Sequence, residues 1–394
     1  MKRCSICLVL VTALCFFMPR APQADEISDL KRQLEETEKR LTALEQQGAA
    51  PVEAEEDWTP FEKIVKGVEF HGALDLTYID WESEGQSSGT STLDVYELYL
   101  AAYTDLGRHL SVYFEPRYEH SGENIELRQG YIDWKILEPL TARFGKFYMP
   151  IGIFRDAYYA SLRNLVSYPF SMRMINVSPW EEVGVKLYGE QGFINDDIKI
   201  KFELAVVNGL NEEYTQNSSD KVRSARQNRD NNSNKTIGGR IGLVPFRGLE
   251  IGGSYNTGKY DDDAEYRLEF VGADLAFTYA DLAIRAEWVK STAETAAGDV
   301  ETRGGYANLG YKVFKDRWGI DFVEGVVAYD YIDPGQDIKD RFFIHADQKV
   351  EKISVGLRAQ LMDHFFIKAE YQFTEEDDPE IDNDAVFAQV VAAF

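Results

Sequence analysis

Three arginines in one long segment are the residues of this sequence best suited to binding chemistry. The segment 149–181 carries Arg155, Arg163 and Arg173, and Asp156 is its only acid before the last residue. The whole chain has 42 Lys and Arg against 67 Asp and Glu, a formal net charge of −25. Guanidinium groups bind anions through several directed N–H donors. A positive segment in an acidic chain is therefore a candidate anion-selective element, and the alternative is that its arginines bridge carboxylates and hold it in place.

Two more basic residues stand just before this segment. Arg143 and Lys146 are three positions apart, so on a β-strand their side chains point to opposite faces unless a bulge intervenes. Other basic residues alternate with acids on neighbouring segments, and we expect most of them to form screened ion pairs. These basic residues are Arg117, Arg128, Lys186, Lys199 and Lys201, and the acids are Glu115, Glu126, Glu190 and Glu203.

Signatures of catalysis and of cofactor binding are absent from the sequence. It contains no P-loop, dinucleotide fingerprint, paired-histidine zinc helix or nucleophile elbow, and its five histidines are scattered. We therefore predict no catalytic residues, no cofactor and no metal site. The nearest approach to a catalytic pair is His109 beside Ser111, which would suit a barrel hydrolase. The acidic charge balance also argues against a nucleic-acid partner.

The N-terminus has the layout of a targeting signal. Residues 1–24 have a basic start, an apolar run from Ile6 to Met18 and a small-residue stretch ending at Ala24. This pattern predicts a secretory signal peptide. An uncleaved membrane anchor and a lipoprotein signal at Cys15 are the alternatives. All three cysteines lie in this segment, so the mature chain would cross an oxidising compartment without any cysteine.

A short heptad pattern follows the predicted signal peptide. Ile27, Leu34 and Leu41 repeat at one heptad position, and charged residues fill most of the others. Residues 25–47 are therefore predicted to form a coiled-coil helix, which favours self-association over packing on its own chain. Residues 48–66, rich in acids and small residues, are predicted to be a linker.

From Val68 the hydrophobic period changes to two, which indicates β-strands. Segments of about ten residues with one apolar and one polar face suit tilted strands that cross a membrane. The breaks between them are alternately short and long, as in outer-membrane barrels. We predict an all-β fold, a transmembrane antiparallel β-barrel of about sixteen strands over residues 67–394, with a soluble sandwich or solenoid as the alternative. The sixteen segments are 68–80, 93–104, 109–119, 126–137, 140–148, 183–190, 197–207, 236–244, 248–258, 266–278, 281–290, 304–314, 319–331, 350–362, 364–374 and 385–394.

The last residue supports the same prediction. Phe394 ends the sequence, and apolar residues precede it at every second position back to Val386. A terminal aromatic residue on such a strand is a predicted signal for the barrel assembly machinery. An even number of strands places both ends of the barrel on the periplasmic side, and the coiled coil with them.

The segment that carries the basic residues resembles a known family. Residues 143–152 have the sequence RFGKFYMPIG, which is similar to the G-K-F-x-x-P-x-G strand end of the phosphate-selective porin O/P family of Gram-negative outer membranes. The order of signal peptide, coiled coil and barrel resembles that family too. The resemblance implies a homotrimer, passive uptake of anions such as phosphate, and a third loop folded into the channel, here residues 149–181. Siderophore porins carry a comparable segment.

The expected function is a water-filled outer-membrane channel for small solutes. Arg155, Arg163, Arg173, Arg143 and Lys146 are the predicted constriction residues. The acidic composition departs from the basic ladder of the anion channels, so phosphate selectivity does not transfer with the resemblance. A siderophore or other specific-ligand uptake barrel, and a binding or adhesion barrel plugged by its loops, are the alternatives. Outer-membrane lipid and lipopolysaccharide are the expected surroundings.

Overall fold

The computed structural model describes most of the chain from residue 67 onward. The predicted signal peptide 1–24, coiled coil 25–47 and linker 48–66 lie outside the described residues, so these three assignments stay predictions. The described ranges are 67–81, 91–175, 179–193, 197–216, 225–227, 229–317, 319–333, 349–376 and 383–394.

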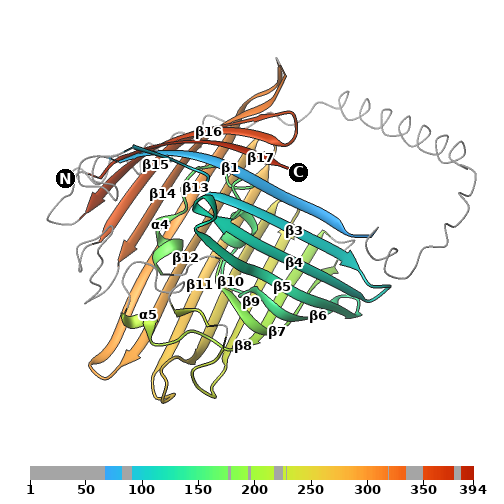
Figure 1. Cartoon of the computed structure of the whole chain (residues 1–394), viewed down its shortest axis with the longest axis vertical. Helices are drawn as coiled ribbons and strands as arrows, with labels where there is room; N and C mark the ends of the chain where they lie inside the picture. Colours follow the sequence, from blue (N-terminus) through green and yellow to red (C-terminus); the bar gives the residue numbers. More distant parts are fainter. Residues whose placement is uncertain are drawn as a thin grey trace, which may run out of the picture. The chain divides into compact units, whose positions relative to one another are not determined.

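The described residues form a single antiparallel sheet that closes on itself (Figure 1). Its strands are β1 (Glu69–Trp81), β2 (Ser91–Asp94), β3 (Glu97–Asp105), β4 (Leu110–Glu119), β5 (Asn124–Leu137), β6 (Leu140–Tyr148), β7 (Glu181–Phe193), β8 (Ile198–Val207), β9 (Thr236–Phe246), β10 (Leu249–Lys259), β11 (Arg267–Tyr279), β12 (Leu282–Thr295), β13 (Gly298–Arg317), β14 (Ile320–Asp333), β15 (Val350–Leu361), β16 (Phe365–Glu376) and β17 (Ala385–Ala393). β2 and β3 both pair with β1 and are two parts of one interrupted strand. With β2 and β3 counted as one, the barrel therefore has sixteen strands, as predicted.

The predicted segments match these strands closely. The main differences are the break at residues 95–96, which divides the predicted segment 93–104, and the length of β13, which spans 20 residues where 304–314 was predicted. The ends of a strand that reach beyond the lipid lose the apolar alternation, because both faces then meet water or other protein groups. Periodicity therefore underestimates their length.

The distribution of side chains is the reverse of that in a soluble protein. On β16, Ile367 and Phe373 are exposed on the outer face, whereas Lys368, Glu370 and Gln372 are buried inside. Apolar side chains alternate with polar ones in this way along most strands. An apolar exterior around a polar interior is the arrangement that a barrel needs in lipid.

Four short helices accompany the sheet in the described residues: η1 (His120–Gly122), η2 (Phe154–Ala157), α4 (Phe170–Met174) and α5 (Glu213–Gln216). Helix α4 contacts β13 and β14, and Figure 1 draws it within the ring of strands. No helix in the described part of the chain has the length and apolar character to span a membrane.

Candidate functional site

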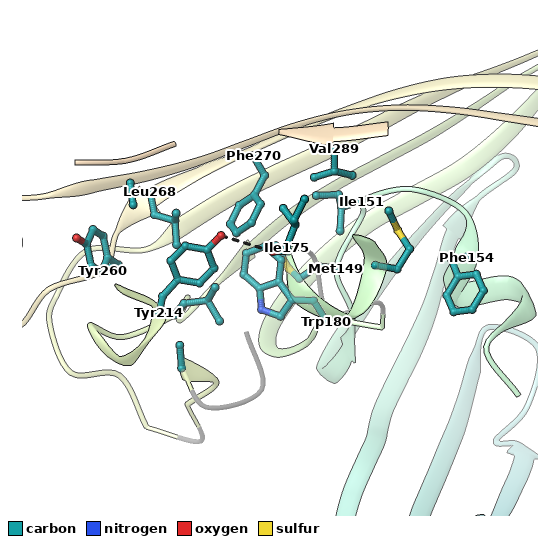
Figure 2. Close-up of a cluster of buried hydrophobic side chains, with 14 of the residues drawn as sticks. Met149, Ile151, Phe154, Ile175, Trp180, Tyr214, Tyr260, Leu268, Phe270 and Val289 are labelled. Carbon is teal, nitrogen blue, oxygen red and sulfur yellow. Dashed lines mark hydrogen bonds between the residues drawn. The ribbon is translucent and has the colours of Figure 1, made fainter. Parts of the chain in front are cut away.

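The connection between β6 and β7 runs inside the barrel. This inner loop, residues 149–180, is described except for residues 176–178. Its Met149 and Trp180 are at most 2 % exposed. They belong to a cluster with Phe270 of β11 and Val289 of β12 (Figure 2), and the rings of Trp180 and Phe270 lie 5.2 Å apart. The apolar and aromatic composition of the loop is thus explained by its packing against the inner wall.

Gly152 lets the inner loop approach the far side of the barrel. It has φ +59°, and a side chain at this position would collide with the carboxylate of Glu287 on β12. Only glycine combines this backbone conformation with such a close approach. The final glycine of the RFGKFYMPIG segment is therefore required where the chain leaves β6 and crosses the lumen.

Two wall carboxylates hold backbone amides of the inner loop. Glu370 of β16 accepts hydrogen bonds from the amides of Val166 and Ser167, both at 2.8 Å, and from the Ser167 hydroxyl at 2.6 Å. Asp330 of β14 accepts from the amide of Phe170 and, at 3.0 Å, from that of Ser171. These carboxylates satisfy backbone donors that would otherwise be buried without partners.

Wall cations hold the carbonyl groups of the same loop. Lys368 of β16 donates to the carbonyl oxygen of Ala160 at 2.5 Å, and Arg358 of β15 donates to that of Ser161 at 2.8 Å. Lys352 of β15 lies 3.4 Å from the carbonyl oxygen of Tyr168. The loop is therefore fastened to strands that come about 200 residues later in the chain.

Arg155 is paired with the wall of the barrel. Its guanidinium donates to both carboxylate oxygens of Glu203 on β8, one of them at 3.1 Å, and to the carbonyl oxygen of Met149 at 2.9 Å. Lys186 of β7 reaches the same carboxylate at 3.0 Å. Glu203 thus pairs with two cations, and Arg155 connects the inner loop to β8.

Arg163 folds back on the inner loop itself. It is 4 % exposed and donates to the carbonyl oxygens of Tyr158 at 2.5 Å and Val166 at 2.7 Å. Burial would lower its pKa, but the Tyr168 phenol and the Asp75 carboxylate nearby raise the pKa above its ordinary value. Its guanidinium lies 4.1 Å from the centre of the Tyr168 ring. Arg163 therefore stays charged without a direct carboxylate partner among the described residues.

The other predicted site residues lie in different surroundings. Arg143 on β6 forms two hydrogen bonds of 2.8 Å to Asp133 of β5. Lys146 follows Gly145, which has φ +136° although the pairing of β6 with β5 and β7 continues through it, and Lys146 has no hydrogen bond or ion pair within the described ranges. Arg173 is part of α4, and its side chain lies outside the description. Arg155, Arg163 and Arg143 therefore each bind different partners.

An ion-pair network that the sequence did not predict lies on the β3–β7 wall. Arg117 binds Glu126, and both are among the residues expected to form ion pairs. Arg128 lies 2.8 Å from Glu97 and 3.3 Å from Glu181. Arg226, from the polar segment after β8, also binds Glu181. Nothing in the composition of that segment distinguishes Arg226 from neighbouring basic residues, because its partners lie far away in sequence.

The inner loop separates two cavities. One, of about 190 Å³, lies against β11–β15, and the other, of about 340 Å³, lies against β1, β2 and β15–β17. We call them the β11–β15 cavity and the β1–β17 cavity. Arg163, Tyr168 and Lys352 line both. Arg285 of β12 lines only the first and has no hydrogen bond or ion pair in the part of the chain that the structure describes.

The first cavity carries a positive balance of charge. Its lining contains four basic side chains and two acidic ones. The basic ones are Arg163, Arg285, Lys352 and Arg358, and the acidic ones are Glu324 and Asp330. The β1–β17 cavity has Arg163 and Lys352 against Asp94, besides His120. Both cavities are therefore basic inside an acidic chain.

The outside of this barrel suits lipid and its divided lumen suits water, a combination that defines the porin class of outer-membrane channels for small solutes. Within that class the chain belongs to the phosphate-selective porin O and P family, whose model matches residues 68–392. This result confirms the family, the fold and the outer-membrane location that the sequence predicted.

Several solved structures share this fold, and one sequence relative matches part of the chain. The anion-selective porin of Comamonas acidovorans has a TM-score of 0.56 at 13% identity, covering 83% of this chain and 99% of its own. OmpF of Salmonella typhi, in complex with daunomycin, has a TM-score of 0.56 at 15% identity, covering 83% of this chain and 97% of its own. OmpT of Vibrio cholerae has a TM-score of 0.54 at 12% identity, covering 83% of this chain and 97% of its own. An uncharacterized protein of Aquifex aeolicus (strain VF5) is 24% identical over 215 residues, 52% of this chain and about half (47%) of the relative.

Proposed function

We propose that solutes pass beside the inner loop and that the channel favours small anions. The observation that carries this proposal is the net positive lining of both cavities in a chain of net charge −25. A pore selects by the sign of charge at its narrowest part, so the average charge of the whole chain does not determine which ions the pore prefers. A relative described as an anion-selective porin shares the fold, which is compatible with this proposal.

Three of the five predicted constriction residues then divide into two roles. Arg163 and its neighbour Lys352 line both cavities and supply part of the positive field. Arg155 and Arg143 have acids in direct contact, Glu203 and Asp133, so their main role is to fix the loop and the wall. In this proposal the cations of the barrel wall contribute to ion selectivity as much as the inner loop does.

Planar-bilayer recording in a salt gradient of KCl tests the proposal. K⁺ and Cl⁻ have similar mobilities, so the sign of the reversal potential reports directly which ion the pore prefers. A potential of the anion-selective sign supports the proposal, and a cation-selective sign contradicts it. No conductance at all would favour the plugged binding barrel or the siderophore receptor instead.

The proposal includes no enzymatic activity. His109, the one candidate for a hydrolase site, makes no side-chain hydrogen bond or ion pair among the described residues, and no carboxylate orients its ring. A catalytic histidine needs such a partner and a nearby nucleophile. Hydrolysis of phospholipid by the purified protein, lost in His109→Ala, would contradict this part.

We also propose that three copies assemble and that residues 25–47 support the assembly from the periplasm. The heptad pattern supports this proposal, and a relative solved in a trimer form shares the fold. Lipopolysaccharide at the outer rim and recognition of Phe394 by the barrel assembly machinery belong to the same proposal. Current that rises in groups of three equal steps is the expected result in bilayers.

A further inference from the structure

Arg285 differs from the other basic groups of the β11–β15 cavity. Arg163 and Arg358 donate to backbone carbonyl oxygens of the inner loop at 2.7 and 2.8 Å, and Lys352 lies 3.4 Å from another. Arg285 also lines the cavity and is only half-buried. Because its guanidinium makes no hydrogen bond or ion pair among the described residues, its donors are the ones in this cavity that a solute can use without displacing a protein group.

The wall around Arg285 consists of small, uncharged residues. The pairing of β11 to β15 places in one row Ala276, Arg285, Asn308, Ala328 and Ser354, all of which line the cavity. The next row towards the short turns contains Thr278, Ala283, Gly310, Val326 and Gly356. Arg285 is the one charged residue among these positions, and its small neighbours leave space around its guanidinium.

The acids near Arg285 have other partners. Glu287, two residues further along β12, accepts a hydrogen bond at 2.8 Å from a tyrosine hydroxyl of β13. Asp330 accepts from backbone amides of the inner loop, and Glu324 lies 3.8 Å from Arg358. These carboxylates weaken the positive field of the cavity, but they do not occupy the donors of Arg285.

The inner loop presents an apolar side chain to the same cavity. Leu162 lines the cavity and is 56 % exposed. The other large apolar side chains in the described part of the loop are buried or half-buried. Removing apolar surface from water is favourable, so a solute with an apolar part gains free energy by covering Leu162.

From this combination of an arginine with available donors and an exposed leucine, we infer that the β11–β15 cavity is a binding site for short-chain monocarboxylates on their way through the channel. A carboxylate binds a guanidinium through two parallel N–H···O bonds, and the alkyl chain covers Leu162 and the small side chains of the wall. The volume of about 190 Å³ lies below the usual range of ligand pockets, so the site suits a small solute.

Phosphate fits this site less well than a monocarboxylate does. Its oxygens point in all directions and need donors on several sides, whereas the other basic groups of the cavity already bind the inner loop. The exposed side chain of Leu162 offers phosphate no donor. The chemistry of the cavity is therefore that of one charged head group with a short apolar chain.

The inference rests on the proposed anion channel, so one arm of its test needs no current. In detergent solution, saturation-transfer NMR detects butyrate bound to the protein, and protein-free micelles are the blank. Butyramide is the uncharged analogue, and acetate lacks most of the alkyl chain. We expect butyrate to bind more tightly than either, and inorganic phosphate at the same ionic strength to displace little of it. In bilayers, butyrate should lower the chloride current saturably.

The two arms separate failure of this site from failure of the channel. An anion-selective current without butyrate binding overturns the inference alone. Butyrate binding without an anion-selective current overturns only the channel proposal. Binding of phosphate as tight as that of butyrate would overturn the assignment to monocarboxylates.

Two variants locate the site. Arg285→Gln should weaken butyrate binding about tenfold, the loss expected for a hydrogen bond to a charged group. Leu162→Ser should reduce butyrate to the affinity of acetate, and the exposure of Leu162 makes this exchange compatible with the fold. Arg247→Gln, in an exposed turn outside both cavities, is the control. Unchanged butyrate affinity in Arg285→Gln would overturn the site, and unchanged affinity in Leu162→Ser would overturn the contact with the alkyl chain.

Discussion

Arg155 and Glu203 form a two-point ion pair between the inner loop and β8, with one N···O distance of 3.1 Å. Lys186 shares the carboxylate at 3.0 Å. Because the carboxylate has a second cation, loss of Arg155 does not leave it unpaired. Loss of Glu203, in contrast, leaves two buried cations side by side. The two partners are therefore unequal in their effect on the barrel.

We predict that Glu203→Gln destabilises the barrel more than Arg155→Gln does. Breaking a buried pair and leaving a charge behind costs about 3–5 kcal/mol, and only Glu203→Gln leaves two such charges. Urea unfolding in detergent micelles measures the difference. The exposed pair Arg303–Asp333 offers the control, since Asp333→Asn should change little. Equal losses from the two buried variants would contradict this reading of the shared carboxylate.

A second prediction concerns the anchor at Glu370. In Glu370→Gln the Ser167 hydroxyl and the Gln372 amide lose their acceptor Oε1, which becomes an NH2 group, and the bonds from the two backbone amides of residues 166 and 167 to the remaining oxygen lose the charge that strengthens them. We expect part of the inner loop to detach, which should appear as noisier and larger single-channel currents. Glu301→Gln removes a carboxylate from an exposed pair with Lys290 and serves as the matched control. Quiet currents of unchanged size from Glu370→Gln would show that the loop does not depend on this anchor.

Gly152 gives a third prediction, and Gly298 is a matched control for it. Both have positive φ, +59° and +123°, but a side chain at 298 would meet open space whereas one at 152 would meet Glu287. Gly298→Ala should cost about 1–2 kcal/mol from backbone strain. Gly152→Ala should cost more and also raise protease cleavage within 149–175, because the loop must move away from β12. Identical behaviour of the two variants would mean that the contact with Glu287 does not position the loop.

The fourth prediction tests the charge of the β11–β15 cavity. Arg285→Glu changes its lining from four basic and two acidic side chains to three of each. The reversal potential in a KCl gradient should therefore move towards cations. Arg247→Glu makes the same change in an exposed turn outside both cavities and should leave the potential nearly unchanged. If both variants shift the potential equally, the cavity does not set selectivity.

The barrel could be predicted from the sequence because its information is local. Alternation of Ile367 and Phe373 with Lys368 and Glu370 fixes which face meets lipid, and each strand repeats the same signal. The interruption between β2 and β3 was missed because Val95 and Tyr96 differ little from strand residues by composition. Periodicity records which face a residue occupies and says little about where the hydrogen bonding stops.

The course of the inner loop was harder to predict than its existence. Its aromatic composition indicated a buried loop, but its anchors Glu370 and Asp330 lie 160–204 positions away in sequence. Arg285 was overlooked for a related reason. On its strand it is one basic residue among alternating polar ones, and only the absence of a direct ion pair within the described residues distinguishes it. Such long-range relationships are not contained in spacing along the chain.

The pairing of β1 with β17 has a consequence for biogenesis. Gly72 and Phe394 exchange both backbone hydrogen bonds at 2.9 Å, so the first strand finds its final partner only in the last one. Until β17 arrives, β1 and β16 each keep an unpaired edge, which lipid cannot satisfy. A nascent chain that stops before residue 385 would thus expose two unpaired strand edges and become a substrate for quality-control proteases. Closure of the sheet therefore requires that the whole barrel sequence has been synthesised.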